Sequence, residues 1–312
     1  MMSIDYRTLR IIFLGTPEFA RTSLQALVEA GCRIVGVITA PDRPAGRGMK
    51  LQQSAVKEYA LSQNLPVLQP EKLKDPVFLE SLRALNADLQ LVVAFRMLPE
   101  IVWNMPPMGT INLHGSLLPD YRGAAPINWA LINGETETGV TTFKLKQEID
   151  TGNILLQEKF PIAADETAGE LHDRMKEIGA GLLVRTVQQL AAGSLTELPQ
   201  PVSEVPKHAP KIFTETCRIN WLAPAHAIHN LIRGLSPYPG AFTQFQEKLF
   251  KIYSCSWEEK EHTEIPGSWT VQNGRLSFAC SNGFIYPKTV QPEGKKKMQV
   301  EDFLRGWKGR ES

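Results

Sequence analysis

The sequence predicts an α/β protein in which a parallel sheet is followed by a small antiparallel β-barrel. Between residues 10 and 192, apolar strand-like runs alternate with segments whose apolar residues recur at helical spacing, a pattern typical of a parallel sheet with helices on both faces. Beyond them, short apolar runs are separated by turn residues, which favours a barrel. The length of 312 residues also favours two domains, at about 150 residues each.

The first strand and the first helix illustrate the pattern. Arg10 to Gly15 is an apolar run that ends in glycine, and Pro17 and Glu18 then open a segment with helical spacing. The expected strands are 10–15, 33–39, 88–95, 110–114, 138–146 and 153–160, and the expected helices are 19–30, 54–63 and 167–192. We expect the first domain to end with the last of these helices.

A proline-rich stretch separates the two parts of the chain. Four prolines lie between Leu198 and Lys211 in a sequence with little periodicity, which is typical of an extended linker. We therefore expect a first domain at 1–198, a linker at 199–211 and a barrel domain at 212–312. The expected strands of the barrel are 249–253, 267–271, 276–279 and 284–287.

Composition excludes some classes of protein. Hydrophobic residues make up 43% and charged residues 21% of the chain, and no run approaches the roughly 20 apolar residues of a membrane helix. The first ten residues carry charges of both signs, unlike a signal peptide. Cys32, Cys217, Cys255 and Cys280 are far apart, without a CxxC pair, so we expect reduced thiols and no zinc. We expect a cytoplasmic monomer with no membrane contact.

Charge is distributed unevenly along the chain. From Ile212 onward there are 13 basic and 10 acidic residues, including the run from Lys295 to Lys297. Such a run could contact the phosphates of RNA. An ordinary solvated surface is the alternative.

The residues with the most distinctive chemistry lie at the end of an expected strand. Asn112 and His114 are two positions apart, so their side chains point to one face of the sheet, and Leu113 points to the other. Ligands of open α/β sheets bind beyond the carboxyl ends of the strands, which is where this pair lies. A buried, hydrogen-bonded histidine with a structural role is the alternative.

Several motifs resemble one enzyme family. Asn112-Leu-His-Gly-Ser-Leu-Leu-Pro, followed by Tyr121-Arg-Gly-Ala-Ala-Pro, closely resembles the signature of folate-dependent formyltransferases, and Asp150-Thr-Gly-Asn resembles the second catalytic segment of that family. Pro41-Asp-Arg-Pro-Ala-Gly-Arg-Gly resembles a loop of the branch that formylates methionyl-tRNA. Gly15-Thr-Pro-Glu-Phe-Ala and Ala209-Pro-Lys-Ile are similar to the same branch. Ala94 to Pro99 departs from the family pattern, in which tyrosine and glycine are common.

The resemblance implies a fold, a reaction and roles for three residues. The fold would be a Rossmann-like parallel-sheet formyltransferase domain followed by an OB-like antiparallel barrel. Attack of an amine on a formyl group creates an oxyanion, for which the Asn112 amide is a suitable hydrogen-bond donor. His114 would transfer the proton from the attacking to the leaving nitrogen, and Asp150 would orient and stabilise its imidazolium. A turn-capping aspartate is the alternative for Asp150.

The resemblance also implies two substrates. One is 10-formyltetrahydrofolate, with Ser116, Leu117, Leu118 and Pro119 lining its site. The other is initiator methionyl-tRNA, which the barrel and the basic glycine-containing loop at 41–50 would bind. Candidate contacts in the loop are Arg43, Arg47 and Lys50, with Arg43 favoured over Arg47. The product would be N-formylmethionyl-tRNA for translation initiation, formed without a metal.

Three other functions compete with this interpretation. A formyltransferase acting on a nucleotide or an amino sugar would share the catalytic residues, but it needs neither the basic loop nor the barrel. A dinucleotide-binding oxidoreductase would have to use residues 15–20, which lack the GxGxxG pattern. An RNA-binding protein without catalysis would leave Asn112, His114 and Asp150 unexplained.

Overall fold

The computed structural model describes residues 4–45, 50–202 and 205–306. The chain forms two compact units, each built from several stretches. The first unit comprises residues 1–122, 139–160 and 172–207, and the second comprises 123–138, 161–171 and 208–312. The sequential bounds of 1–198, 199–211 and 212–312 for two domains and a linker stay a prediction, because a compact unit is not the same as an independently folding domain.

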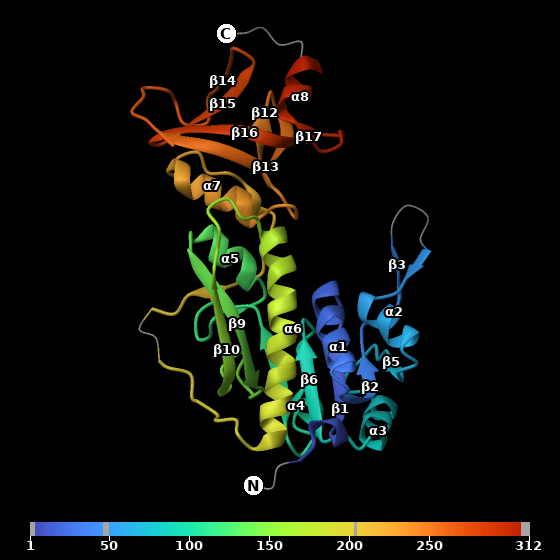
Figure 1. The fold of residues 1–312 in the computed structure, drawn as a ribbon. Helices are drawn as coiled ribbons and strands as arrows, with labels where there is room; N and C mark the ends of the chain where they lie inside the picture. The colour runs from blue at the N-terminus through green and yellow to red at the C-terminus, as the bar shows by residue number, and fades with distance from the viewer. Residues whose placement is uncertain (1–3, 46–49, 203–204, 307–312) are drawn as a thin grey trace. The chain divides into compact units, whose positions relative to one another are not determined.

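The first unit is organised around a seven-stranded sheet (Figure 1). In spatial order its strands are β10 (Ile154–Pro161), β9 (Glu137–Lys144), β7 (Thr110–His114), β6 (Leu89–Val93), β1 (Arg10–Gly15), β2 (Arg33–Ile38) and β5 (Val67–Leu68). The five strands from β7 to β5 are parallel, as expected from the sequence. β9 pairs antiparallel with β7, so the sheet is mixed.

Two helices of the first unit begin at recognisable capping residues. The hydroxyl of Ser54 accepts a hydrogen bond from the backbone N–H of Lys57 at the start of α2, and the Asp75 carboxylate does the same for Val77 in α3, which has Pro76 at its first turn. The helices are α1 (Glu18–Glu29), α2 (Ala55–Ser62), α3 (Pro76–Ala84), α4 (Glu100–Trp103) and, from residue 172 onward, α6 (Ala168–Ala192); a 3₁₀ turn, η1 (Tyr6–Thr8), precedes β1.

The two faces of this sheet are covered differently. α1 and α6 lie on one face, where the rings of Phe19 and His172 are in edge-to-face contact. The apolar residues of α3 and α4 pack with Ile12, Leu14 and Val92 on the other face. Asn112 is paired in register with Val92, so it belongs to this second face. Burial of both faces accounts for the nearly continuous apolar runs of the central strands.

The second unit contains a six-stranded antiparallel sheet, which confirms the antiparallel domain expected from the sequence. Its strands are β12 (Ala241–Phe245), β13 (Lys248–Glu259), β14 (Trp269–Gln272), β15 (Arg275–Cys280), β16 (Gly283–Pro292) and β17 (Met298–Gln299). Asn273 and Gly274, both with positive φ, form the two-residue turn between β14 and β15. Such a turn matches the twist of a hairpin.

Helices and short elements complete this unit. They are α5 (Pro126–Ile132), α7 (Ala225–Gly234), α8 (Val300–Gly306), the 3₁₀ turn η2 (Glu215–Cys217) and the short strand β11 (His208–Ala209). β11 pairs with β8 (Arg122–Gly123), of which Arg122 belongs to the first unit and Gly123 to the second. Residues of α7 and of the sheet share one hydrophobic core with Cys217, Cys255 and Cys280. These three cysteines and Cys32 are buried free thiols, as expected.

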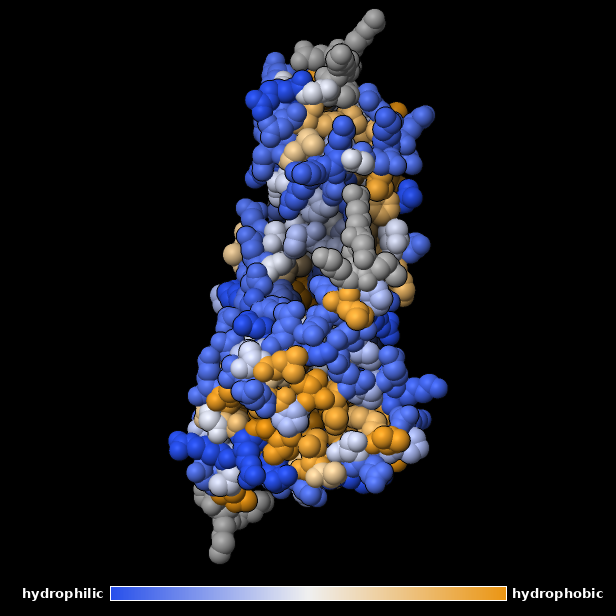
Figure 2. All heavy atoms as spheres, turned by 90° about the vertical axis from the view of Figure 1, so that its right-hand side faces the viewer, coloured by the Kyte–Doolittle hydropathy of each residue, from blue (hydrophilic) through white to orange (hydrophobic). Residues whose placement is uncertain are grey.

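Within the described residues, no helix is both long and apolar enough to cross a membrane. Figure 2 shows one face of the molecule, where hydrophilic side chains cover most of the area and apolar ones gather in its lower part.

Candidate active site

The end of β7 presents Asn112 and His114 on one face, as the strand periodicity predicts. Leu113 points to the opposite face toward α6, where a Cβ atom built on Gly179 would lie 3.0 Å from its side chain. Asn112 is half-buried, and its amide makes no hydrogen bond within the described part of the chain. An amide N–H group at the end of the strand is therefore available to a ligand.

The ring of His114 lies between two acceptors. Its Nε2 is 2.9 Å from the carbonyl oxygen of Tyr121, and its Nδ1 is 3.9 Å from Oδ2 of Asp150. A carbonyl only accepts hydrogen bonds, so the neutral ring carries its proton on Nε2. Nδ1 is then the basic atom, and a proton gained there would face the Asp150 carboxylate.

Burial strengthens the interaction of this pair. The His114 side chain is 7% exposed and that of Asp150 is 12% exposed, and the ring packs edge-to-face on Phe143 of β9. Screening by water is weak in such surroundings, so the two groups interact more strongly than they would in solution. The structure thus brings His114 and Asp150 together, on the face of the sheet that also carries Asn112. These are the three residues predicted to be catalytic.

The segment from Ser116 to Pro119 is held by side chains of two neighbouring strands. Thr141 of β9 donates to the Ser116 carbonyl (2.7 Å) and accepts from the Leu118 N–H (3.1 Å). Gln157 of β10 donates to the Leu118 carbonyl (2.9 Å). Ser116 and Leu118 are buried, and Leu117 and Pro119 are partly exposed. Contact between this segment and a folate stays a prediction, and Thr141 and Gln157 are supporting residues that the sequence analysis missed.

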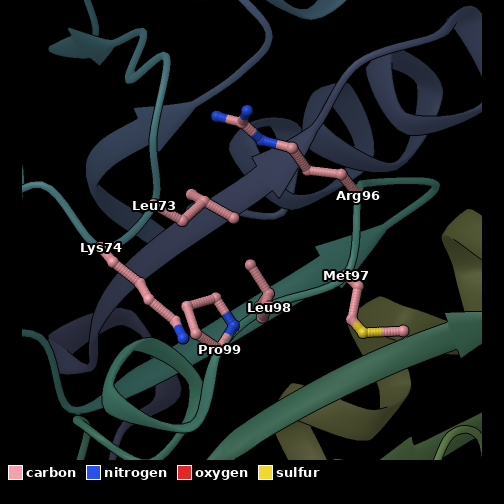
Figure 3. Close-up of a pocket in the computed structure, with 6 residues that line it drawn as sticks. All are labelled: Leu73, Lys74, Arg96, Met97, Leu98 and Pro99. Carbon is pink, nitrogen blue, oxygen red and sulfur yellow. The ribbon is translucent and has the colours of Figure 1, made fainter.

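A pocket of about 340 Å³ lies beside the end of β6, the strand next to β7. Its lining residues are Leu73, Lys74, Arg96, Met97, Leu98 and Pro99, and Figure 3 shows the apolar side chains of Leu73, Leu98 and Pro99 gathered between the two cations. The Arg96 guanidinium donates to the carbonyl oxygens of Pro70 and Glu71. Most of this lining falls in the segment 94–99, which the sequence analysis noted only as a departure from the family pattern.

The basic loop at 41–50 has a structured base. Arg43 is exposed and begins β3 (Arg43–Ala45), which pairs antiparallel with β4 (Lys50–Gln52). Before β3, the Asp42 carboxylate accepts hydrogen bonds from Lys57 (2.5 Å) and Gln69 (2.8 Å), and these bonds lower the pKa of Asp42. Arg47 and the side chain of Lys50 lie outside the described residues. tRNA contacts by the three basic residues stay a prediction.

Comparison with known proteins identifies the family. The model of the formyl transferase family matches residues 9–187, and that of the formyl transferase C-terminal domain matches 211–308. Methionyl-tRNA formyltransferase of Bacteroides fragilis is 51% identical over 309 residues, covering 96% of this chain and 95% of the relative. The enzyme of the same name from Parabacteroides distasonis is 53% identical over 312 residues, covering 96% of both chains.

A solved structure supports the fold. It is that of a sugar 3N-formyl transferase, WlaRD, in the presence of dTDP and 5-N-formyl-THF, which is 20% identical and covers 92% of this chain and 99% of its own, with a TM-score of 0.67. At that identity the likeness concerns the fold alone. The two family models and the identity of about half of all residues over nearly the full length show that this chain belongs to the formyl transferase family and, within it, to the methionyl-tRNA formyltransferases.

Proposed function

We propose that this protein transfers the formyl group of 10-formyltetrahydrofolate to the amino group of methionine on initiator tRNA, giving N-formylmethionyl-tRNA for translation initiation. The observation that carries the proposal is the position of the His114 ring between Tyr121 and Asp150, with Asn112 on the same face. The reaction belongs to the chemistry for which the relatives are named.

The three residues divide the chemistry of the reaction. The amine attacks the formyl carbon, and the Asn112 amide donates a hydrogen bond to the oxygen that becomes negative. Nδ1 of His114 accepts the proton that the attacking nitrogen loses and returns it to the folate nitrogen as the old C–N bond breaks. Asp150 stabilises the charged ring between these two proton transfers. One C–N bond forms, one breaks, and the net proton transfer is between the two nitrogens.

The donor would bind beside the ends of β6 and β7. Ser116 to Pro119 would form part of its site, with Leu117 and Pro119 as the partly exposed members of this segment. The neighbouring pocket between Leu73 and Pro99 combines an apolar lining with two cations, which suits a flat ring system that carries carboxylates. The sugar formyl transferase with the similar fold was studied with 5-N-formyl-THF, which supports a folate as the donor here. None of the proposed roles needs a metal.

The acceptor would be recognised by basic residues outside the catalytic group. Arg43 is exposed at the start of the β3–β4 hairpin, and Arg47 and Lys50 are the other candidates in the same loop. Lys295, Lys296 and Lys297 of the second unit are exposed as well and could contact phosphates. A nucleotide or sugar acceptor would need neither feature, so tRNA is the acceptor that these residues favour. We further propose that the protein acts in the cytoplasm and that it is a monomer. Light scattering of the purified protein would test the monomeric state.

Formylation assays test the proposal directly. Purified protein would be incubated with 10-formyltetrahydrofolate and initiator methionyl-tRNA, with elongator methionyl-tRNA or free methionine in parallel reactions. Formylmethionine would be quantified after hydrolysis of the ester. We expect formylation of the initiator alone, and its loss in His114→Ala. His226→Ala, which changes an exposed histidine of the second unit, is the matched control and should stay active.

Two results would count against the proposal. Absence of transfer to any tRNA by a protein that still binds the folate would contradict the tRNA acceptor and favour a small amine. Full activity of His114→Ala would contradict the catalytic role of the ring.

A further inference from the structure

The direction of the Asp150 carboxylate depends on the loop between β9 and β10. Asp150 has a φ of 54°, in the left-handed region that few residues other than glycine adopt. Two residues later, a Cβ atom on Gly152 would lie 1.5 Å from the carbonyl oxygen of Lys144, so the loop lies directly against β9 there. A small shift of this backbone would move the carboxylate away from His114.

The side chain of Gln200 holds this backbone. Its Nε2 donates one hydrogen bond to the carbonyl of Asp150 and another to the carbonyl of Gly152, both at 2.8 Å. A primary amide has two N–H groups, so one side chain can satisfy both carbonyls and fix the turn between them. The hydrogen bonds reach Asp150 from a residue 50 positions away in the sequence.

The same amide is connected to the other partner of the catalytic ring. Oε1 of Gln200 accepts hydrogen bonds from Nε (3.1 Å) and Nη2 (2.5 Å) of Arg122. Arg122 directly follows Tyr121, whose carbonyl contacts Nε2 of His114. Gln200 therefore joins the two segments that face the two nitrogens of the His114 ring.

The backbone around Gln200 is itself fixed in the first unit. Leu198 and Ile154 exchange two hydrogen bonds, of 2.7 and 2.9 Å, and the carbonyl of Lys207 accepts from the N–H of Tyr121 at 2.7 Å. The segment is thus bound to the catalytic unit on both sides of Gln200, although its composition is that of a linker. Neither family model includes position 200, since one ends at residue 187 and the other begins at 211.

We propose that Gln200 is a positioning residue for formyl transfer, acting on His114 through Asp150 on one side and through Arg122 and Tyr121 on the other. This inference rests on the proposed function, because positioning matters only if His114 and Asp150 carry the reaction. Loss of the Gln200 bonds lowers the rate of the chemical step and leaves the binding of both substrates unchanged, since the binding surfaces are elsewhere.

Two substitutions at position 200 separate the roles of the amide. Gln200→Met keeps most of the side-chain length and removes all of its hydrogen bonds. Gln200→Glu keeps an acceptor for Arg122 and removes both donations to the loop. We expect each variant to lose kcat by about 10- to 100-fold, since a displacement of about 1 Å in a catalytic group has effects of this size. KM for each substrate should stay within about twofold of the wild type.

Gln63→Met is the matched control, because Gln63 is exposed at the end of α2 and its side chain bonds only to Ser62 within the described residues. It should retain wild-type kcat. Thermal unfolding of all variants would be recorded, and kcat would also be measured well below the unfolding temperature of each protein.

Each outcome decides between the alternatives. Wild-type kcat in both Gln200 variants would overturn the inference, and so would a loss confined to KM or a loss that disappears at low temperature, where a weakened fold is restored. A reduced kcat with unchanged KM in a folded Gln200→Glu protein supports it, even if Gln200→Met fails to fold. A wild-type protein that does not formylate methionyl-tRNA would instead contradict the proposed function.

Discussion

His114 combines features of a structural histidine with features of a catalytic one. It is buried and hydrogen-bonded through Nε2, as a structural histidine would be. Its Nδ1, however, faces a carboxylate at 3.9 Å, beyond direct hydrogen-bond distance. A ring with a purely structural role would be expected to form direct hydrogen bonds through both of its nitrogens. The second nitrogen is therefore the feature that favours a role in proton transfer.

Gly152 offers a test of how closely the Asp150 loop must pack. We expect Gly152→Ala to lower kcat by about 10²-fold, because its methyl group would occupy the position of the Lys144 carbonyl oxygen and push the loop away from β9. The measurement is steady-state formylation of initiator methionyl-tRNA.

The control for this prediction is Gly181→Ala in α6, where an added Cβ atom meets no atom within 4 Å. Alanine favours helix over glycine by about 1 kcal/mol, so this variant should be as active as the wild type and equally or more stable. If Gly152→Ala were fully active as well, the position of the loop would not limit catalysis.

At the scale of elements, α7 carries a histidine that should make the second unit sensitive to acid. His229 is buried, with its ring 3.4 Å from Asp165 and 3.6 Å from the sulfur of Cys255. Burial lowers the pKa of His229, despite the opposing effects of a backbone hydrogen bond and Asp165. The unfolded chain therefore binds a proton at a higher pH than the folded one. The stability that the neutral ring contributes is present above the ordinary histidine pKa of about 6.5 and is lost as the pH falls through the lower pKa of the folded state.

The expected result is a difference in pH dependence between two proteins. The free energy of unfolding in urea should decrease more between pH 7.5 and pH 5.5 for the wild type than for His229→Gln, which has no proton to gain there. Equal decreases for the two proteins would show that His229 does not cause the acid sensitivity. His226→Gln, at an exposed position of the same helix, should behave as the wild type does.

The sequence predicted some elements better than others for physical reasons. β1 and β6 were predictable because they are buried and therefore mostly apolar along their length. α3 was missed although Asp75 and Pro76 mark its start, and α7 was missed although it is strongly amphipathic. Both helices therefore carry a local signal, a capping residue in α3 and an apolar face in α7.

The residues of the candidate active site also differ in how far the sequence predicted their positions. Asn112 and His114 could be placed on one face from strand periodicity alone. The proximity of Asp150 came from family resemblance, since no local pattern relates it to β7. The bonds of Gln200 join residues 50 and 78 positions apart, and neither spacing nor propensity encodes such a contact. The proline-rich composition around it predicted a linker, whereas Gln200 is hydrogen-bonded into the first unit.

At the scale of the whole molecule, the chain passes between the two units five times, after residues 122, 138, 160, 171 and 207. Only the last passage leads to the long stretch that contains the antiparallel sheet. The second unit thus includes two short stretches, 123–138 and 161–171, that precede most of α6 in the sequence.

This interleaving means that a break after Lys207 would not separate the units cleanly. The larger fragment would keep α5, whose Asn128 and Trp129 donate to carbonyls at Gly234 and Pro210 of the smaller one, and whose Ile132 packs against the core of the second unit. The two pieces should reassemble into an active split enzyme when co-expressed, whereas 1–207 alone should aggregate through the exposed face of α5. Co-purification through a tag on one fragment would reveal the reassembly, and an active, monodisperse 1–207 would refute it.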